Sequence, residues 1–337
     1  MGYKILEGDC LTSLIRFPTE SIDSIIQDPP YEIGFMGNGW DNTGVAYDPK
    51  TWRAAHRVLK KGGYMVTFSA TRTHHRMMDA MQRAGFEVLG VVAWCYGTGF
   101  PKSQNISKFI DKAAGAEREI IGVEDRRNAF DGGKRKSMGH SNEYGSITNK
   151  GEVSTTAPAT AEAQQWDGWG SGLKPAWEPI IIARKKGGEE PPRQYSSFHY
   201  IAKPSKKERN EGCEDLPEKL YAPSNQAKAE LKRGNTDYNA WEGKDHSKRN
   251  NYNHIGVSKN NHPTVKPVAL MEALVAEFSD EGDIVLDSFA GSGTTGIAAL
   301  RLNREFIGCE MTEEYLPLMQ TRLDHAIATL KEAEVVV

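Results

Sequence analysis

Two short segments of the 337-residue chain carry side chains that could do chemistry. Asp28-Pro29-Pro30-Tyr31 follows the β-branched run 21–27, and two consecutive prolines cannot continue a central strand. We therefore predict a loop at the carboxyl end of a strand, where open α/β sheets bind ligands. An aspartate, proline carbonyls and a tyrosine ring together suit a planar base with an exocyclic amine.

The second segment, 287–296 (DSFAGSGTTG), joins a predicted strand to a predicted helix. Gly291-x-Gly293-x-x-Gly296 matches the dinucleotide fingerprint, in which glycines allow close approach of a ligand and the helix start offers free N–H groups. Glu310 ends the next predicted strand about twenty residues later, a spacing typical of an acidic residue that binds ribose hydroxyls. The pattern indicates an adenosine-containing cofactor, with a tight turn of an unrelated α/β fold as the alternative. No lysine follows the glycines, which argues against a P-loop.

Alternating strands and helices must hold these two loops. Strands are predicted at 3–6, 21–27, 64–69, 86–94, 177–184, 284–289 and 305–310. Helices are predicted at 51–59, 73–84, 104–114, 268–278, 295–302 and 312–335, with Gly62-Gly63 closing the first. This alternation favours a mostly parallel sheet flanked by helices.

Composition narrows the class of protein. Hydrophobic residues make up 38% and charged residues 26%, so the chain can build a core. No apolar stretch approaches the roughly 20 residues that cross a bilayer, and no signal peptide is expected. Four scattered cysteines favour a reducing cytoplasm over a disulfide scaffold or a zinc ribbon, and no metal site is predicted. Because the net charge is −3, any nucleic acid must bind a segregated positive face.

Together these segments resemble the amino-group DNA methyltransferases. Residues 28–31 resemble the catalytic loop of that family, 287–296 its S-adenosylmethionine loop, and 262–267 (HPTVKP) the HPTxKP segment that precedes this loop. Gly8-Asp9-Cys10 and the segments 99–108 and 172–184 are also similar to the family. The catalytic loop comes first and the cofactor loop last, which resembles the β class of N6-adenine and N4-cytosine enzymes. The similar segments cover 1–110, 170–205 and 260–325.

The resemblance implies a fold and a division of the chain. The expected fold is α/β, a Rossmann-like class I methyltransferase sheet that is circularly permuted and carries an inserted target-recognition region. The expected parts are a catalytic half at 1–97, an insert at 98–175 with DNA contacts, a returning sheet strand at 176–185, a target-recognition region at 186–261, and an S-adenosylmethionine-binding half at 262–337.

The resemblance also implies a reaction, the transfer of a methyl group from S-adenosylmethionine to the N6 amine of a flipped adenine in double-stranded DNA. The catalytic residues would be Asp28, Pro29, Pro30 and Tyr31, with Asp28 and the Pro29 carbonyl accepting the amine hydrogens and Tyr31 stacking on the base. Glu310 would bind the ribose, Asp9 and Cys10 the adenine, and Lys266 would be a counter-charge at the carboxylate end of the cofactor. The expected cofactor-binding residues are Asp9, Cys10, Thr264, Lys266, Pro267, Asp287, Phe289, Gly291, Ser292, Gly293, Thr294, Thr295 and Glu310.

Basic residues of the inserts are candidates for contacts with DNA phosphates, which Lys and Arg commonly bind. They are Lys102, Arg126, Arg127, Lys134, Arg135, Lys136, Lys206, Lys207 and Arg209. Four alternatives stay open: an N4-cytosine DNA methyltransferase, an RNA or protein N-methyltransferase, a nicotinamide oxidoreductase, and a non-catalytic DNA-binding relative. A homodimer, a restriction endonuclease partner and the recognition sequence are left undecided by the sequence.

Overall fold

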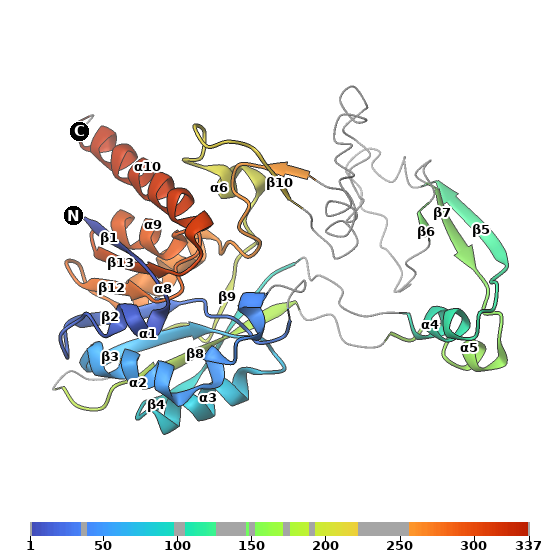
Figure 1. The fold of residues 1–337 in the computed structure, drawn as a ribbon, viewed down its shortest axis with the longest axis horizontal. Coiled ribbons are helices and arrows are strands. Elements are labelled where there is room, and N and C mark those ends of the chain that lie inside the picture. The colour runs from blue at the N-terminus through green and yellow to red at the C-terminus, as the bar shows by residue number, and fades with distance from the viewer. Residues whose placement is uncertain are drawn as a thin grey trace. The chain divides into compact units, whose positions relative to one another are not determined.

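The computed structural model describes residues 2–34, 39–97, 105–125, 146–147, 152–170, 176–188, 193–221 and 256–335 (Figure 1). The chain divides into two compact units. The first consists of Met1–Thr98, Ala176–Thr236 and Asn253–Val337, and the second of Gly99–Pro175 and Asp237–Tyr252.

An eight-stranded sheet of order β1-β13-β12-β2-β3-β8-β4-β9 forms the centre of the first unit. In chain order its strands are β1 (Tyr3–Glu7), β2 (Ile22–Gln27), β3 (Leu59–Phe68), β4 (Glu87–Cys95), β8 (Trp177–Arg184), β9 (Phe198–Tyr200), β12 (Ile284–Asp287) and β13 (Glu305–Glu310). Strand β8 is antiparallel to both of its neighbours, and every other pair is parallel. The carboxyl ends of β1, β13, β12 and β2 therefore meet at one edge of the sheet.

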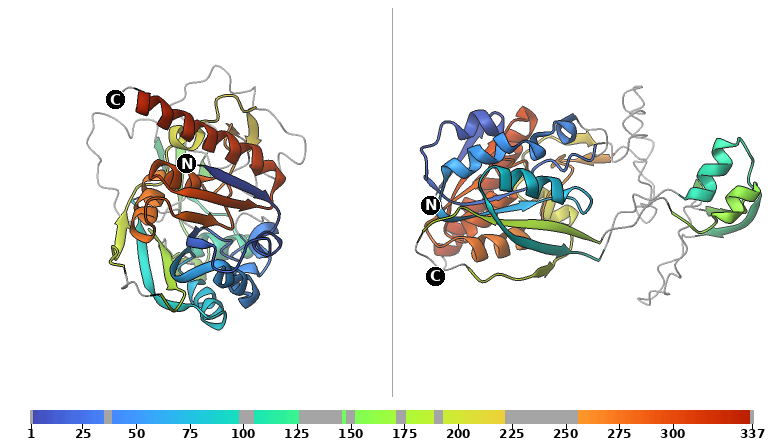
Figure 2. Two further views of the ribbon diagram at one scale, coloured as in Figure 1. Left: turned by 90° about the vertical axis from the view of Figure 1, so that its left-hand side faces the viewer. Right: turned by 90° about the horizontal axis from the view of Figure 1, so that it is seen from below.

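Helices cover both faces of this sheet (Figure 2). Alternate residues of β2 and β3 point to opposite faces, as the two-residue period of a strand requires. Ile26 and Val66 pack in a core with α8 (Val268–Phe278), α9 (Thr294–Arg301) and α10 (Leu316–Val335). Ile25 and Met65 pack in a second core with α1 (Cys10–Leu14), α2 (Pro49–Val58) and α3 (His74–Arg83). The mixed α/β architecture with a mostly parallel central sheet is thus confirmed.

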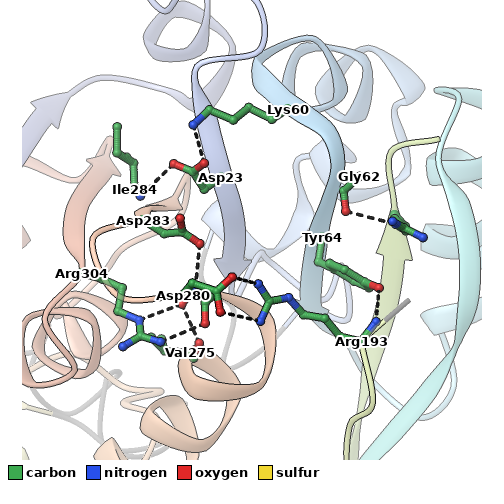
Figure 3. Close-up of polar contacts among 12 residues, drawn as sticks. Asp23, Lys60, Gly62, Tyr64, Arg193, Val275, Asp280, Asp283, Ile284 and Arg304 are labelled. Carbon is green, nitrogen blue, oxygen red and sulfur yellow. Dashed lines mark hydrogen bonds and ion pairs between the residues drawn. The ribbon is translucent and has the colours of Figure 1, made fainter. Parts of the chain in front are cut away.

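Polar contacts hold together the amino-terminal edge of the sheet (Figure 3). Asp23 of β2 accepts the backbone N–H of Ile284 at 3.0 Å and pairs with Lys60 of β3. Beside it, Arg193 forms a two-pronged ion pair with Asp280. These ion pairs tie segments that are distant in sequence, and they lie at the end of β2 opposite Asp28.

Small elements complete the first unit. Strands β10 (Lys219–Tyr221) and β11 (Gly256–Ser258) pair antiparallel, and α6 (Lys206–Asn210) precedes them. Among the described residues, no helix is long and apolar enough to cross a membrane.

The second unit contains α4 (Ile106–Ala113), α5 (Ala161–Gln165) and a three-stranded antiparallel sheet of order β5-β7-β6. Its strands are β5 (Ile120–Asp125), β6 (Ser146–Ile147) and β7 (Glu152–Thr156). The buried Asp111 of α4 pairs with Arg118 and accepts the backbone N–H groups of Ala159 and Thr160, both at 3.0 Å. This carboxylate therefore joins the helix to the chain that follows β7.

The end of α2 differs from the expectation that Gly62-Gly63 closes this helix. Helix α2 ends at Val58, and both glycines lie inside β3. A Cβ on Gly63 would lie 2.8 Å from the carbonyl oxygen of Asp23, so the glycine lets β3 pass close to β2. The pair therefore serves strand packing instead of ending the helix.

Candidate active site

A cavity of about 280 Å³ lies where β1, β13, β12 and β2 end. Ordinary ligand pockets measure roughly 300–1,000 Å³, so this one is slightly smaller than that range. Its lining includes Asp28 and Pro30, which follow β2, together with the residues that follow β12. Parallel pairing of β2 with β12 thus brings together the two segments in which the sequence concentrates its chemistry.

Most of the predicted site residues line this cavity. They are Asp9, Cys10, Asp28, Pro30, Thr264, Lys266, Asp287, Phe289, Gly291, Ser292, Thr294, Thr295 and Glu310. Four others do not line it, namely Pro29, Tyr31, Pro267 and Gly293. Pro267 is the residue before α8 and Gly293 the residue before α9, so both act on the backbone at a helix start.

Asp287 fixes the loop that follows β12. Its carboxylate accepts the backbone N–H of Phe289 at 2.9 Å and the hydroxyl of Thr295 at 2.6 Å. Burial raises the pKa of Asp287 to about 7, and the nearby carboxylates of Asp28 and Glu310 act in the same direction. Asp287 can therefore change its charge close to neutral pH.

Glu310, at the end of β13, braces the same loop from the other side. Its two oxygens accept the backbone N–H groups of Gly291 and Thr312, at 2.8 and 2.7 Å. A Cβ on Gly296 would lie 2.5 Å from the ring of Phe306, so this glycine allows α9 to pack directly on β13. The loop is thus held by hydrogen bonds and by close packing between helix and strand.

The carboxylate of Asp28 has one engaged and one open oxygen. Oδ2 pairs with the ammonium of Lys266, whereas Oδ1 is buried and accepts no hydrogen bond from the described residues. Burial raises the pKa of Asp28, and Lys266 opposes this rise without cancelling it. Lys266, expected at the carboxylate end of the cofactor, thus contacts the catalytic loop and also lines the cavity beside the loop that follows β12.

The backbone of this loop is held by hydroxyl groups. Tyr47 and Thr73 both donate to the carbonyl of Tyr31, at 3.1 and 3.2 Å. The hydroxyl of Tyr31 itself donates to Glu178 at 2.9 Å. Hydrogen bonds thus fix both the backbone and the side chain of Tyr31.

Glu178, on β8, belongs to the site although the sequence analysis assigned it no role. Its carboxylate accepts the hydroxyls of Tyr31 and Tyr96 and lies 3.8 Å from the ammonium of Lys203. An acidic residue inside the otherwise apolar run 177–183 was the available indication in the sequence.

His262 is a second residue without an assigned role. It lines the cavity, and its Nδ1 is buried without a hydrogen-bond partner among the described residues. Burial lowers the pKa of His262 to about 3, with further lowering by the cations Lys266, Arg209 and Arg322. The imidazole is therefore neutral and can hydrogen-bond a ligand.

The candidate DNA contacts are only partly described. Lys206 and Lys207 of α6 are exposed. Arg209 is half-buried, and its guanidinium donates to the carbonyl of His262 at 2.5 Å, so it supports the cavity wall. The remaining candidates lie outside the described residues: Lys102, Arg126, Arg127, Lys134, Arg135 and Lys136.

Comparisons with known proteins identify the family of the chain. DNA adenine methyltransferase YhdJ of Escherichia coli is 27% identical over 327 residues, which cover 96% of this chain and 83% of YhdJ. Type II methyltransferase M.HpaI of Haemophilus parainfluenzae is 38% identical over 112 residues, 32% of this chain and 31% of its own. The solved structure of the cytosine-N4-specific PvuII DNA methyltransferase has a TM-score of 0.52 and 17% identity, over 96% of this chain and 86% of that one, and shares the fold. The model of the N6_N4_Mtase family, described as DNA methylase, matches residues 22–321, and the chain therefore belongs to this family of amino-group DNA methyltransferases.

Proposed function

We propose that the protein transfers a methyl group from S-adenosylmethionine to the N6 amine of an adenine that is flipped out of double-stranded DNA. The observation that carries the proposal is the open oxygen of Asp28, which lines one cavity with the loop after β12. An acceptor for amine hydrogens and a cofactor loop are thereby within one small space.

The donor set of the cavity fits S-adenosylmethionine. Three cavity-lining residues carry buried polar atoms without a partner among the described residues: Asp28 Oδ1, Ser288 Oγ and His262 Nδ1. Buried polar groups are normally hydrogen-bonded, so these atoms call for a polar ligand. Asp287 suits the cationic amine of the methionine part, and Glu310 retains lone pairs for the ribose hydroxyls. When bound, the cofactor supplies an electrophilic methyl group.

The carboxylate of Asp9 has a structural role at the start of α1. Its carboxylate caps α1 by accepting the backbone N–H groups of Leu11 and Thr12, at 2.9 and 3.1 Å. Asp9 and Cys10 then shape the wall against which the adenine of the cofactor packs. Thr264 lines the cavity between His262 and Lys266 and completes the polar side of the pocket.

Asp28 and the Pro29 carbonyl prepare the target amine. The lone pair of an adenine amine is delocalised into the ring, which makes it a poor nucleophile. The two N–H groups of the amine donate hydrogen bonds, one to Asp28 and one to the Pro29 carbonyl. These bonds localise the lone pair on the nitrogen and direct it at the methyl group. Positioning then supplies much of the acceleration. As the amine nitrogen gains the methyl group it becomes acidic and gives up a proton to Asp28, leaving S-adenosylhomocysteine as the second product. Flipping the base costs a few kcal/mol, and Tyr31 stacks on the extruded ring.

The order of segments along the chain supports a division into a catalytic half, a cofactor-binding half and DNA-binding inserts. The catalytic half at 1–97 precedes the cofactor half at 262–337, as in a circularly permuted methyltransferase of the β class. The inserts at 98–175 and 186–261 then supply DNA contacts and target recognition, and 176–185 returns to the sheet.

Adenine is favoured over cytosine as the target. The DPPY form of the catalytic loop favours adenine, and one relative that matches most of this chain is named an adenine methyltransferase. N4-cytosine is the second candidate, because it also presents an exocyclic amine on a six-membered ring.

A comparison of expressed DNA tests the proposal. The wild-type protein and Asp28→Ala are each expressed in a host that lacks DNA methylation, and the host DNA is digested to nucleosides for mass spectrometry. N6-methyladenine in the wild type alone supports the proposal, and long-read sequencing of the same DNA then gives the recognition site. Detection of N4-methylcytosine instead would show that the target is cytosine. An absence of both methylated bases would refute DNA methylation by this chain in that host.

A further inference from the structure

Glu178 lies at the centre of a polar cluster behind the catalytic loop. Strand β8 begins at Trp177 and runs antiparallel to β3, so Glu178 lies at the same edge of the sheet as Asp28. Its side chain is 18% exposed. One oxygen accepts the hydroxyl of Tyr31 at 2.9 Å, and the other accepts the hydroxyl of Tyr96 at 3.3 Å.

Two lysines also approach this carboxylate. The ammonium of Lys203 is 3.8 Å from Glu178 and lies 4.2 Å from the centre of the Tyr96 ring. The ammonium of Lys266 is 3.9 Å from Glu178 and contacts Asp28 directly. Glu178 and Asp28 therefore share one buried cation. A buried carboxylate without a counter-ion destabilises the folded protein, so both groups depend on Lys266.

Lys266 has little freedom to leave this position. Its side chain is 8% exposed, and its ammonium lies 4.8 Å from the centre of the Phe68 ring and 5.5 Å from that of Tyr31. The cation is held by two carboxylates and two aromatic faces. Any change in the charge of Glu178 therefore acts on Asp28 through Lys266 without moving either side chain far.

We infer that Glu178 is a positioning residue for methyl transfer, which fixes the Tyr31 ring and, by sharing Lys266, keeps Asp28 free to accept hydrogen bonds from the target amine. This inference rests on the proposed role of Asp28. Glu178 acts through Tyr31 and Lys266, because it is not among the residues that line the cavity.

The charge of Glu178 also affects how the rate depends on pH, because it acts on the pKa of Asp28. The ionisable groups that face Asp28 are Lys266, Glu178, Tyr31 and Asp287. Burial is the main cause that raises the pKa of Asp28, Lys266 lowers it, and the charge of Glu178 raises it again. Glu178→Gln removes this last charge and keeps Lys266, so the pKa of Asp28 falls. The acidic limb of kcat then moves to lower pH.

Variants of Glu178 separate charge from position. Glu178→Gln keeps an oxygen that can accept the Tyr31 hydroxyl, whereas Glu178→Ala removes both the charge and the acceptor. Misplacement by about 1 Å can cost roughly 100-fold in rate, so we expect Glu178→Ala to lower kcat by about 10- to 100-fold. Tyr31→Phe removes the same hydrogen bond from the other side, so its kcat should fall. Because the Tyr31 hydroxyl lowers the pKa of Asp28, the acidic limb of this variant should move to higher pH, opposite to that of Glu178→Gln.

The matched control is Glu277→Gln. Glu277 is exposed to a similar extent, 20%, and faces His199 and Ser196 away from the cavity. Turnover of unmethylated DNA is measured with saturating cofactor across the pH range, together with KM for both substrates and the Tm of each variant. We expect Glu178→Gln to shift the acidic limb, Glu178→Ala to lower kcat at unchanged KM for the cofactor, and Glu277→Gln to behave as the wild type.

The inference would be overturned by an unchanged pH profile in Glu178→Gln together with an unchanged kcat in Glu178→Ala. A loss of Tm that accounts for the whole loss of activity in both variants would also overturn it, because Glu178 would then be purely structural. If the wild type itself formed no methylated base, the proposed function would fail first. A wild type that needs Asp28 but tolerates every Glu178 variant refutes this inference alone.

Discussion

Asp28 and Asp287 follow and end neighbouring parallel strands, β2 and β12, and both line the same cavity although most of the chain separates them in sequence. The pairing of these two strands places an open carboxylate oxygen opposite a glycine-rich loop. The chemistry that we propose depends on this single relationship.

Asp28→Asn should lower kcat by about 100- to 1,000-fold and spare cofactor binding. The amide keeps the size of the side chain, but it carries no charge and offers weaker acceptance of amine hydrogens. Loss of one preorganised electrostatic contact typically costs about 10²–10³ in kcat. Calorimetry should give an unchanged affinity for S-adenosylmethionine. An affinity that falls in parallel with kcat would assign Asp28 to the cofactor instead.

The affinity for S-adenosylmethionine should fall as the pH drops below about 7, the pKa to which burial raises Asp287. Above this pH the carboxylate is ionised and attracts the amine of the methionine part, and below it the group is neutral. For one linked proton the limiting change is about tenfold per pH unit. His262, with a pKa of about 3, stays neutral throughout and does not contribute. Asp287→Asn should bind weakly and without this slope, and an equal slope in the variant would contradict the assignment.

Gly296→Ala should destabilise the protein through packing. The added Cβ would lie 2.5 Å from Phe306 and 2.6 Å from Leu323, and overpacking of a core commonly costs about 1–3 kcal/mol. Urea unfolding measures this loss of unfolding free energy. Gly39→Ala is the control, since no described atom lies within 4 Å of the Cβ that it adds. Equal stability of the two variants would show that α9 does not need close contact with β13.

The salt dependence of DNA binding should distinguish the basic residues of α6 that contact phosphates from those that do not. If Lys206 and Lys207 bind DNA phosphates, replacing both by alanine lowers the slope of log K against log salt by about 0.9 for each contact. Arg209 donates to the carbonyl of His262, so Arg209→Ala should weaken cofactor binding and leave this slope unchanged. A wild-type slope in the double lysine variant would remove these two residues from the DNA interface.

The parts of the fold that local sequence determines were predicted closely. Strands β8 and β13 have the expected bounds. Each is a short hydrophobic stretch with charged residues at or near both of its ends. Helix α8 also begins and ends as expected, since Pro267 precedes its first turn. The two chemical segments were found because glycines, prolines and acidic residues follow strand ends there.

The parts that depend on distant partners were missed. The sheet of the second unit consists of short strands in a polar stretch, joined to α4 through Asp111 and its partner Arg118. Glu178 is a functional candidate because Tyr31 and Lys266 approach it from segments far along the chain. No pattern of spacing within the sequence gives these contacts.

The central claim is methyl transfer to adenine at Asp28, and labelled cofactor tests it most directly. Purified protein is incubated with unmethylated duplex DNA and S-adenosylmethionine that carries a trideuterated methyl group, and the nucleosides are identified by mass spectrometry. The account predicts trideuterated N6-methyladenine with the wild type and none with Asp28→Ala. Label on adenine with both proteins, or label on cytosine N4 alone, would contradict it.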